Sequence, residues 1–390
     1  MPLNILIIGT GLYVCGRGSD GYGTILPAIY EWKRKEREGN IYIAGRNPEG
    51  IGIIRDKVKG LNELFGFEIK PLYYPKDNLH NQNAYLDAIR EIPKPACVII
   101  AAPDNLHKQM ASDTIEHCLH TLVVKPLAPT LREVLELIEL QQKRCVYCAV
   151  EFHKRFDYAN LKLKDTIAQG LIGEPLYFLV EYSQRKSMPA KFFKKWIAST
   201  NVFQYLGIHY VDIIYFATNG LPQRVMASGQ KNWLYSKGID TYDSIQGVIE
   251  WETPSGKKFT SCILTHWVDP ESSSAMSDQK IKVIGTKGRF ESDQKARGIT
   301  ITSDERGIEE PNPYFSSPYG REGKVTYRGY AIESITQFLK DVVQIEKGEL
   351  KIDELQEARP TFKQAIIPTA VIEGINRSLE NNGKWVDVKR

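Results

Sequence analysis

The sequence predicts an α/β fold, with a doubly wound parallel sheet at the N-terminal side and an α+β domain with an open, mostly antiparallel sheet behind it. Three observations support this fold class. The chain begins with a short apolar run over residues 3–8 and a glycine-rich loop. Apolar runs and amphipathic segments then alternate up to residue 151, as strands and helices do in a doubly wound fold. Beyond residue 151, apolar and polar side chains alternate in several segments, which is typical of strands with one covered face.

The run at residues 3–8 predicts a strand buried on both faces. Gly9 and Gly11 follow it as the first two glycines of a G-x-G-x-x-G dinucleotide fingerprint. The first glycine permits a tight turn, and the second lets a pyrophosphate approach the backbone. The third position holds Val14, and four further glycines lengthen the loop before a helix over residues 25–37. Alone, such a fingerprint is equally compatible with a loop that binds no ligand, but the flanking strand and helix favour a dinucleotide.

Side chains beside the fingerprint bear on the choice of cofactor. Leu12 and Arg17 are expected at the cofactor, where Arg17 either pairs with a phosphate or remains a solvated charge. The second strand, residues 41–44, ends at Arg46 and Asn47, without the acid that usually binds the ribose 2′-hydroxyl of NAD. Arg46 could pair with a 2′-phosphate, which puts NADP ahead of NAD. Alternatively, Arg46 stacks near the adenine or caps the strand.

The rest of the N-terminal half repeats the alternation. We expect helices at 56–65, 85–92, 108–117 and 131–143, and strands at 69–74, 96–101, 121–124 and 145–151. In an open parallel sheet, ligands bind outside the carboxyl ends of the strands. The segment APDNLH follows the strand at 96–101, so four of its residues are expected beside the cofactor, on the same rim as Asp104: Ala102, Pro103, Asn105 and His107. Of these, His107 is expected to orient the next helix rather than to take part in chemistry.

The pattern changes after residue 151. We expect helices at 156–170, 203–217, 330–347 and 362–381, a strand at 176–184, several strands between 224 and 302, and a long loop at 305–329. Two domains follow: residues 1–150 bind the dinucleotide, and residues 151–390 bind substrate and form oligomer contacts. Whether the C-terminal helix packs back on the first domain stays open.

Composition excludes several classes of protein. The 390 residues are 42% hydrophobic and 25% charged, and the net charge of +4 gives no case for a nucleic-acid binder. No apolar stretch reaches the length of a membrane span, and the first apolar run lacks the basic leader of a signal peptide. Six scattered cysteines suit reduced thiols, so we expect a cytoplasmic protein. Cys145 and Cys148 form a lone C-x-x-C without further ligands nearby, so no metal is expected.

Seven motifs occur in one order along the chain: GTG, APDNLH, KPL, EFHKRFD, GIHYVD, GTKGRFE and AVIEGI. Together they resemble the Gfo/Idh/MocA family of glucose–fructose oxidoreductase, inositol dehydrogenase and rhizopine-catabolism proteins, and the resemblance covers nearly the whole chain. It implies an N-terminal Rossmann domain and a C-terminal α+β domain whose open sheet packs against another subunit, in a homo-oligomer (dimer or tetramer). It also implies oxidation or reduction of sugars, inositols or their derivatives with NAD or NADP.

The resemblance also implies site residues. The E-K-P signature of the family falls on Val124-Lys125-Pro126, so the lysine that lies beside the nicotinamide is retained and the glutamate is not. Lys125 and Pro126 are therefore expected at the cofactor. A later motif retains its histidine as His209 but holds Tyr205 where the family usually has aspartate, which puts the usual Lys–Asp–His arrangement in doubt.

Hydride transfer from an alcohol needs a base for the hydroxyl proton and a group that stabilises the developing alkoxide. Lys125 is predicted to be the electrostatic and orienting group, and it can also act as base if burial depresses its pKa. His209 is predicted to be the acid/base. Tyr205 lies four residues earlier, on the same face of a helix, and is the predicted partner. A core aromatic and a packed helix histidine are the alternative interpretations of Tyr205 and His209.

The segment 185–196 (RKSMPAKFFKKW) is basic, and the corresponding region of the family borders the substrate pocket. An anionic group on the substrate, such as a carboxylate, phosphate or nucleotide diphosphate, would pair with these charges. The alternative is a solvated loop. The residues expected at the substrate are Arg185, Lys191 and Trp196, with Asp212 from a common acidic position of the family, and His153 and Arg155, which face either cofactor or substrate.

These observations predict an NAD(P)-dependent sugar or polyol dehydrogenase or reductase. It would transfer hydride between nicotinamide and a hydroxyl or keto carbon of a sugar, a polyol, or an anionic or nucleotide-linked sugar derivative. The alternative is a non-catalytic NAD(P)-binding regulator of the same fold, because two signature acids are replaced, although the retained Lys125 and His209 weigh against it. A structural interaction protein would leave the glycine loop unexplained.

Overall fold

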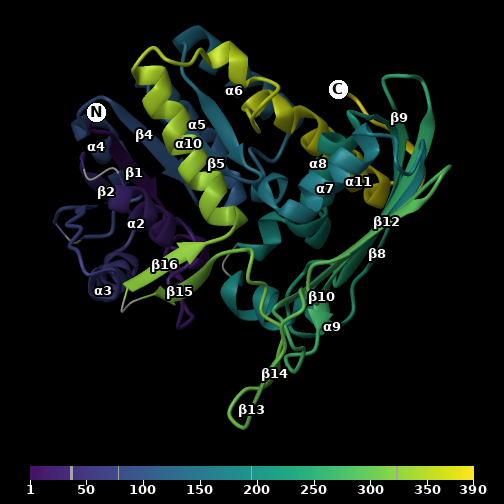
Figure 1. Ribbon diagram of the computed structural model, residues 1–390, viewed down its shortest axis with the longest axis horizontal. Helices are drawn as coiled ribbons and strands as arrows, with labels where there is room; N and C mark the ends of the chain where they lie inside the picture. Colours follow the sequence, from purple (N-terminus) through teal and green to yellow (C-terminus); the bar gives the residue numbers. More distant parts are fainter. Residues whose placement is uncertain (36–37, 78, 195, 322–323) are drawn as a thin grey trace. The chain divides into compact units, whose positions relative to one another are not determined.

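A computed structural model describes residues 1–35, 38–77, 79–194, 196–321 and 324–390. The chain divides into two compact units (Figure 1). Unit 1 comprises Met1–His153 and Tyr314–Ala365, and unit 2 comprises Lys154–Pro313 and Ile366–Arg390. The first boundary lies close to the predicted one at residue 150, but residues 314–365 cluster with the N-terminal residues rather than with the second domain.

Unit 1 is built on a six-stranded parallel sheet with the order β3-β2-β1-β4-β5-β6. The strands are β1 (Asn4–Ile8), β2 (Ile41–Ala44), β3 (Leu72–Tyr74), β4 (Ala96–Ile100), β5 (His120–Val124) and β6 (Cys148–Glu151). The residues of β1, β2 and β4 are all buried, as expected for strands covered on both faces. The order reverses between β1 and β4, which is the crevice where a doubly wound sheet binds its ligand. The predicted fold class is confirmed.

Helices connect these strands: α2 (Ile25–Lys35), α3 (Pro48–Phe65), α4 (Ala84–Glu91), α5 (His107–Glu116) and α6 (Leu131–Arg144). The helix α3 begins at Pro48, although the sequence predicted its start at Asp56. The reason is local, because the Asn47 side chain accepts a hydrogen bond from the Gly50 N–H (2.8 Å) and proline is favoured in the first turn of a helix. The pairs α2 with α10 (Tyr330–Glu346) and α5 with α6 pack together.

The glycine-rich loop contains a helical turn that the sequence did not predict. The short helix α1 (Leu12–Cys15) ends at Gly16, which has a positive φ of 73°, and α2 begins at Ile25. A Cβ at Gly16 would lie 2.2 Å from the Gly21 carbonyl oxygen. The loop between α1 and α2 therefore folds closely on itself. From α3, the Lys57 ammonium donates to the carbonyls of Ser19 (2.9 Å) and Gly21 (2.6 Å).

The long loop predicted at 305–329 was wrong, because this stretch forms strands. In unit 1, β15 (Ser317–Arg321) pairs with β16 (Lys324–Arg328), and in unit 2, β13 (Ile301–Ser303) pairs with β14 (Gly307–Glu309). The strand β16 packs on α2 and α3, and the Tyr327 N–H donates to Glu31 (2.7 Å). Strands this short have little periodicity of their own, so their pairing depends on tertiary contacts.

Unit 2 contains a seven-stranded sheet with the order β12-β11-β7-β10-β9-β8-β17. Its strands are β7 (Pro175–Arg185), β8 (Leu221–Gln230), β9 (Ser244–Glu252), β10 (Lys258–Asp269), β11 (Ser277–Gly285), β12 (Arg289–Asp293) and β17 (Val386–Asp387). Only the β7–β10 pair is parallel. The C-terminal helix α11 (Ile366–Glu380) packs on β8 and on α8 (Ile208–Thr218) in this unit, whereas α10 packs in unit 1.

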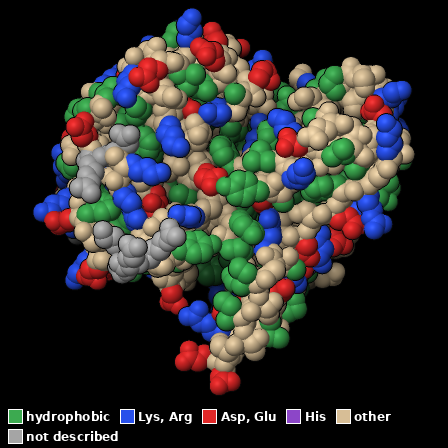
Figure 2. All heavy atoms as spheres, in the orientation of Figure 1, with side chains coloured by type: hydrophobic (Ala, Val, Ile, Leu, Met, Phe, Trp, Pro, Cys, Tyr) green, Lys and Arg blue, Asp and Glu red, His purple; other side chains and the backbone are tan. Residues whose placement is uncertain are grey.

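The two faces of this sheet differ. In β9, each second residue is buried and the residues between are half-buried, so one face is covered and the other is open. The remaining helices of unit 2 are α7 (Tyr158–Ala168), which packs against α8, and the four-residue α9 (Trp233–Ser236). Within the described part of the chain, no helix is long and apolar enough to cross a membrane. Basic and acidic side chains are interspersed over the face drawn in Figure 2.

The glycine loop generates a test of stability. Gly9 has a φ of +128°, and a Cβ there would lie 2.2 Å from the Ala101 carbonyl oxygen. We expect Gly9→Ala to lower the free energy of unfolding by about 2 kcal/mol or more, because both the backbone and the contact are strained. Gly11→Ala is the matched control, since its Cβ would meet no described atom within 4 Å. Urea unfolding measures both, and equal stability of the two variants would contradict the expectation.

Candidate active site

The predicted cofactor residues of unit 1 follow the carboxyl ends of β1, β2, β4 and β5. The Gly9 N–H donates to the Ala44 carbonyl, and the Ala101 N–H donates to the Ile8 carbonyl (both 2.9 Å), so the loops after β1, β2 and β4 are tied together. Gly11, by contrast, faces open space at its missing Cβ, as far as the described residues go. Leu12 beside it is half-buried. A pyrophosphate can therefore approach the backbone at Gly11, as the fingerprint requires.

The end of β2 holds two of the predicted cofactor residues in different roles. Arg46 is exposed, while the Asn47 side chain caps α3. Arg17 forms an ion pair with Glu49 in the first turn of α3 (2.7 Å), an arrangement the sequence did not predict. The side chain of Arg17 thus links the extended glycine loop to α3, next to the position where a ribose would lie in a fold of this type.

His107 joins the loops that follow β4 and β5. It is fully buried, and its Nε2 lies 2.8 Å from the Ala102 carbonyl oxygen while its Nδ1 lies 2.6 Å from the Pro126 carbonyl oxygen. Pro103 and Asn105 occupy the same turn, where Asn105 is exposed. His107 therefore holds the loops after β4 and β5 together and orients the residue that precedes Pro126.

That residue is Lys125. Its side chain is only 7% exposed, and burial lowers its pKa to about 8, while the negative charges of Asp104 and Glu151 raise the pKa and offset part of this effect. Both carboxyl groups are themselves buried. An amine with a pKa this close to neutrality can donate a proton, accept one, or stabilise a developing oxyanion.

Glu151 and His153 extend the cluster around Lys125. Glu151 is the last residue of β6, and its Oε2 lies 2.8 Å from His153 Nδ1. The His153 ring stacks on Tyr13 from α1 and on Tyr330 from α10, with centroid distances of 6.2 and 5.7 Å. Glu151 and Tyr13 were not among the site residues predicted from the sequence. A charged residue closing an apolar strand at the ligand-binding edge was the available signal for Glu151.

In unit 2, Tyr205 lies in an aromatic cluster with Phe193, Trp196 and Trp267. The centroid of the Tyr205 ring is 4.7, 5.8 and 5.9 Å from those three rings. The structure thus brings two predicted residues, Tyr205 and Trp196, together. Tyr205 belongs to a π-helical turn, Phe203–Gly207, that leads directly into α8.

His209 is buried in the first turn of α8. Its ring centroid lies 6.1 Å from that of Tyr182 on β7, a side chain whose pKa burial raises. The ammonium of Lys154 lies 5.2 Å from the same tyrosine ring and 3.0 Å from Gln294 Oε1. Lys154 is nearly fully buried and was not predicted as a site residue.

Two predicted substrate residues bind each other. Arg155 and Asp212 are both buried, and the guanidinium donates to both carboxylate oxygens, from Nε to Oδ2 (2.9 Å) and from Nη2 to Oδ1 (2.6 Å). A buried, bidentate pair of this kind neutralises both charges. This pair therefore connects α8 to the segment that opens unit 2.

The basic segment contains a π-helical turn, Met188–Phe192, in which Met188 and Pro189 are buried. The Arg185 guanidinium donates to the Ser273 carbonyl, and the Lys186 ammonium lies 5.1 Å from the Trp233 ring. Lys191 and Lys194 are exposed. Lys195 lies outside the described residues.

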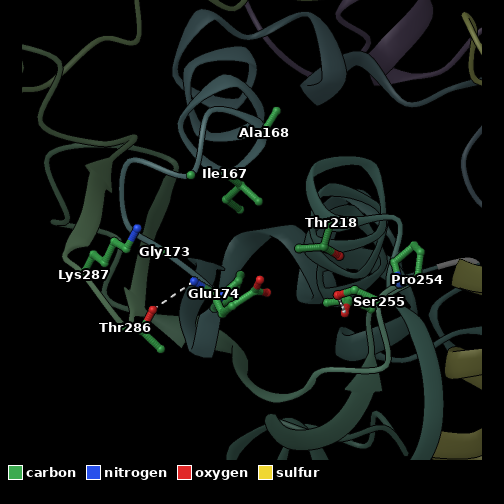
Figure 3. A pocket seen from close by; sticks show the side chains of 12 residues that line it. Ile167, Ala168, Gly173, Glu174, Thr218, Pro254, Ser255, Thr286 and Lys287 are labelled. Atoms are coloured by element: carbon green, nitrogen blue, oxygen red, sulfur yellow. Dashed lines mark hydrogen bonds between the residues drawn. The ribbon is translucent and has the colours of Figure 1, made fainter.

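Unit 2 also contains a hollow. It is lined by residues at the ends of α7 and α8 and in the turns that precede β7, β10 and β12, among them Glu174, Thr218, Ser255, Thr286 and Lys287 (Figure 3). The Glu174 N–H donates to Thr286 Oγ1 there (3.1 Å). None of the predicted site residues lines this hollow.

Comparisons with known proteins decide the family. A model described as an oxidoreductase family with an NAD-binding Rossmann fold matches residues 56–152, and the GFO/IDH/MocA C-terminal domain matches residues 160–291. The chain belongs to the Gfo/Idh/MocA family. The family resemblance predicted from the motifs is confirmed, and this member is an NAD-binding oxidoreductase.

Relatives within the Gfo/Idh/MocA family include inositol and sugar enzymes. The chain is 24% identical over 269 residues to myo-inositol 2-dehydrogenase of Thermotoga maritima, which covers 68% of this chain and 76% of that protein. It is 23% identical over 186 residues to 1,5-anhydro-D-fructose reductase of Ensifer adhaerens, which covers 45% of this chain and 53% of that protein.

Solved structures of Gfo/Idh/MocA proteins share the fold over the whole chain. Scyllo-inositol dehydrogenase from Lactobacillus casei, with bound NAD(H) and scyllo-inositol, has a TM-score of 0.68 at 16% identity and covers 100% of this chain and 99% of its own. An inositol dehydrogenase homolog from Azotobacter vinelandii, complexed with NADH and myo-inositol, has a TM-score of 0.71 at 18% identity, covering 99% and 98%.

The buried Lys125 gives a direct test of the site's electrostatics. In competitive labelling with an amine-reactive reagent, followed by peptide mass spectrometry, we expect Lys125 to reach half of its maximal reactivity near pH 8. Exposed lysines in the same sample should do so near pH 10.4. The difference follows because burial disfavours the ammonium form. A midpoint for Lys125 equal to that of the exposed lysines would contradict the environment described for it.

Proposed function

We propose that this Gfo/Idh/MocA oxidoreductase transfers hydride between the nicotinamide of NAD(P) and a hydroxyl-bearing carbon of a sugar or polyol. The observation that supports this most is a buried lysine of depressed pKa at the carboxyl edge of an NAD-binding sheet. The open space at Gly11 and the tight Gly9 turn fit a dinucleotide. The bound nicotinamide would accept or deliver the hydride.

In this proposal, the residues of the chain divide the remaining tasks. Lys125 stabilises the negative charge that develops on the substrate oxygen, and His107 orients it through the backbone of Pro126. His209 exchanges the hydroxyl proton as acid/base, and Tyr205 is its partner. Gly9, Gly11, Leu12 and the loop from Ala102 to Asn105 bind the cofactor.

The aromatic cluster supports a ring-shaped substrate with an apolar face. Trp196 and Tyr205 are half-buried beside the buried Phe193 and Trp267, and aromatic faces suit the C–H side of a sugar or cyclitol ring. We propose a neutral sugar or polyol first. An anionic or nucleotide-linked sugar is the second candidate, because Lys191 and Lys194 are exposed in the same segment. A higher KM in Lys191→Ala would favour it.

For the cofactor, we propose a preference for NADP over NAD. Arg46 is exposed after the end of β2, and the Arg17 guanidinium reaches from the glycine loop to Glu49 in the first turn of α3, so two guanidinium groups lie near the end of β2, where a 2′-phosphate would bind. The Glu49 carboxylate, paired with Arg17, is the group that would favour NAD instead.

Measured with both cofactors, the ratio of kcat/KM for NADP to that for NAD should fall about tenfold in Arg46→Ala, because one charge-assisted contact is lost.

Turnover tests the proposal. The protein is assayed by absorbance of the reduced cofactor with NAD and with NADP, against a panel of cyclitols, aldoses and nucleotide sugars. We expect one substrate class to be turned over, and Lys125→Ala to lower kcat/KM by roughly 10²-fold or more, as the loss of an oxyanion-stabilising group does. Lys108→Ala is the matched control, since Lys108 is a surface lysine paired with Glu136 on α6. Cofactor binding without any turnover would instead support the non-catalytic regulator.

The open face of the unit 2 sheet supports a homo-oligomer, and we propose that a second copy covers it. A row of apolar side chains crosses four strands in register, Leu179, Cys262, Val248 and Met226, and all are half-buried or exposed.

Light scattering after size exclusion should give a dimer or tetramer for the native chain. Val248→Lys should dissociate it, because the charge would be buried at the contact. Leu135→Lys, on the exposed side of α6, should leave it intact.

A further inference from the structure

Glu151 is a buried carboxylate whose second oxygen is unexplained. The residue is 1% exposed, and only Oε2 meets His153. Oε1 has no hydrogen-bond partner within the described residues. A buried polar oxygen without a partner is costly, and native proteins rarely retain one without a role. The buried Glu151 carboxylate is therefore expected to have a function that offsets this cost.

The register of the sheet indicates which residues the Glu151 side chain lies beside. In the parallel pair of β5 and β6, Glu151 lies directly opposite Val124. Paired residues of neighbouring strands project on the same face of a sheet, about 5 Å apart. The Glu151 carboxylate is thus held beside position 124, the residue that precedes Lys125. This chain has valine at position 124, where the resemblance to the E-K-P signature implies a glutamate.

The groups around Lys125 agree with this placement. The negative charges that act on its ammonium are those of Asp104, after β4, and Glu151, at the end of β6. Two further ionisable groups described at this edge are His107, which faces two backbone carbonyls, and His153, which faces Glu151. Each of these four residues is buried.

His153 has a fixed orientation, which in turn fixes the carboxylate. Its ring is stacked on Tyr13 and Tyr330 and meets the edge of Phe315 at 5.4 Å. The Tyr13 hydroxyl lies 3.4 Å from the same His153 Nδ1. Because Tyr13 lies in α1, two residues after Gly11, the glycine loop is connected through His153 to the carboxylate.

We propose that Glu151, held by His153, supplies from the neighbouring strand the carboxylate that is missing at position 124, and that it is the positioning residue for the ammonium of Lys125. This inference rests on the proposed function for its catalytic meaning. Its physical content, the dependence of Lys125 on Glu151, can be measured without turnover.

The test is the pH midpoint of amine labelling at Lys125, compared between the native chain and two variants. Glu151→Gln keeps the size and polarity of the side chain and removes its charge. Because a negative charge raises the pKa of Lys125, its removal should lower the midpoint from about 8 by about one pH unit or more. The protonated fraction of Lys125 at pH 8 would then fall from about a half to roughly a tenth.

The double variant Val124→Glu/Glu151→Val moves the carboxylate across the strand pair. It should return the midpoint to within about half a unit of the native value, because the same charge lies on the same face of the sheet. Glu346→Gln is the matched control. It removes another carboxylate that meets a histidine, His120, at the opposite end of β5 (3.0 Å), and it should leave the Lys125 midpoint unchanged.

An unchanged midpoint in Glu151→Gln overturns the proposal by itself, whether or not the double variant folds. If the midpoint falls in Glu151→Gln and the folded double variant fails to restore it, the proposal that Glu151 takes the place of a carboxylate at position 124 is overturned. Once a substrate is known, Glu151→Gln should lower kcat, leave KM within about twofold, and move the alkaline limb of the pH profile to lower pH. A lowered labelling midpoint in a protein without turnover supports the pairing while rejecting the proposed function.

Discussion

A buried ammonium at the carboxyl edge of a parallel sheet is the constraint on which the site depends. Burial alone drives Lys125 toward its neutral form, and the two buried carboxylates, Asp104 and Glu151, work in the opposite direction. The result is a group balanced near neutrality. The three residues lie at the carboxyl ends of three adjacent strands, β4, β5 and β6, so the balance is a property of the sheet order rather than of any single loop.

The surrounding loops serve that arrangement. Gly9 permits the loop after β1 to touch the loop after β4, and His107 connects the latter to the turn after β5. Because each of these contacts involves backbone atoms, the positions of Ala102 and Pro126 depend little on their own side chains. The chemistry then rests on a small number of side chains placed on a rigid frame, which is how precise sites are usually built.

Much of the fold was predictable, because most strands of unit 1 are short apolar runs separated by amphipathic helices. Lys125, His107 and Tyr205 were predicted as site residues from motifs and from the rule about strand ends. Other features were not visible in the sequence. The turn α1 is too short for a periodic pattern, the β15–β16 hairpin depends on contacts with α2 and α3, and the Arg155–Asp212 pair depends on tertiary proximity. Glu151 gained significance only when its register with Val124 was known.

The division of the chain has a consequence for its synthesis. Unit 1 requires residues 314–365, and the chain passes between the units after residues 153, 313 and 365. A ribosome therefore completes the whole of the strand-rich segment 154–313 before it makes β16 and α10, which pack on the N-terminal helices α2 and α3. Proteins commonly fold from the N-terminal domain first as they emerge. Here the α2 surface that receives α10 stays uncovered until residues 330–346 have been synthesised.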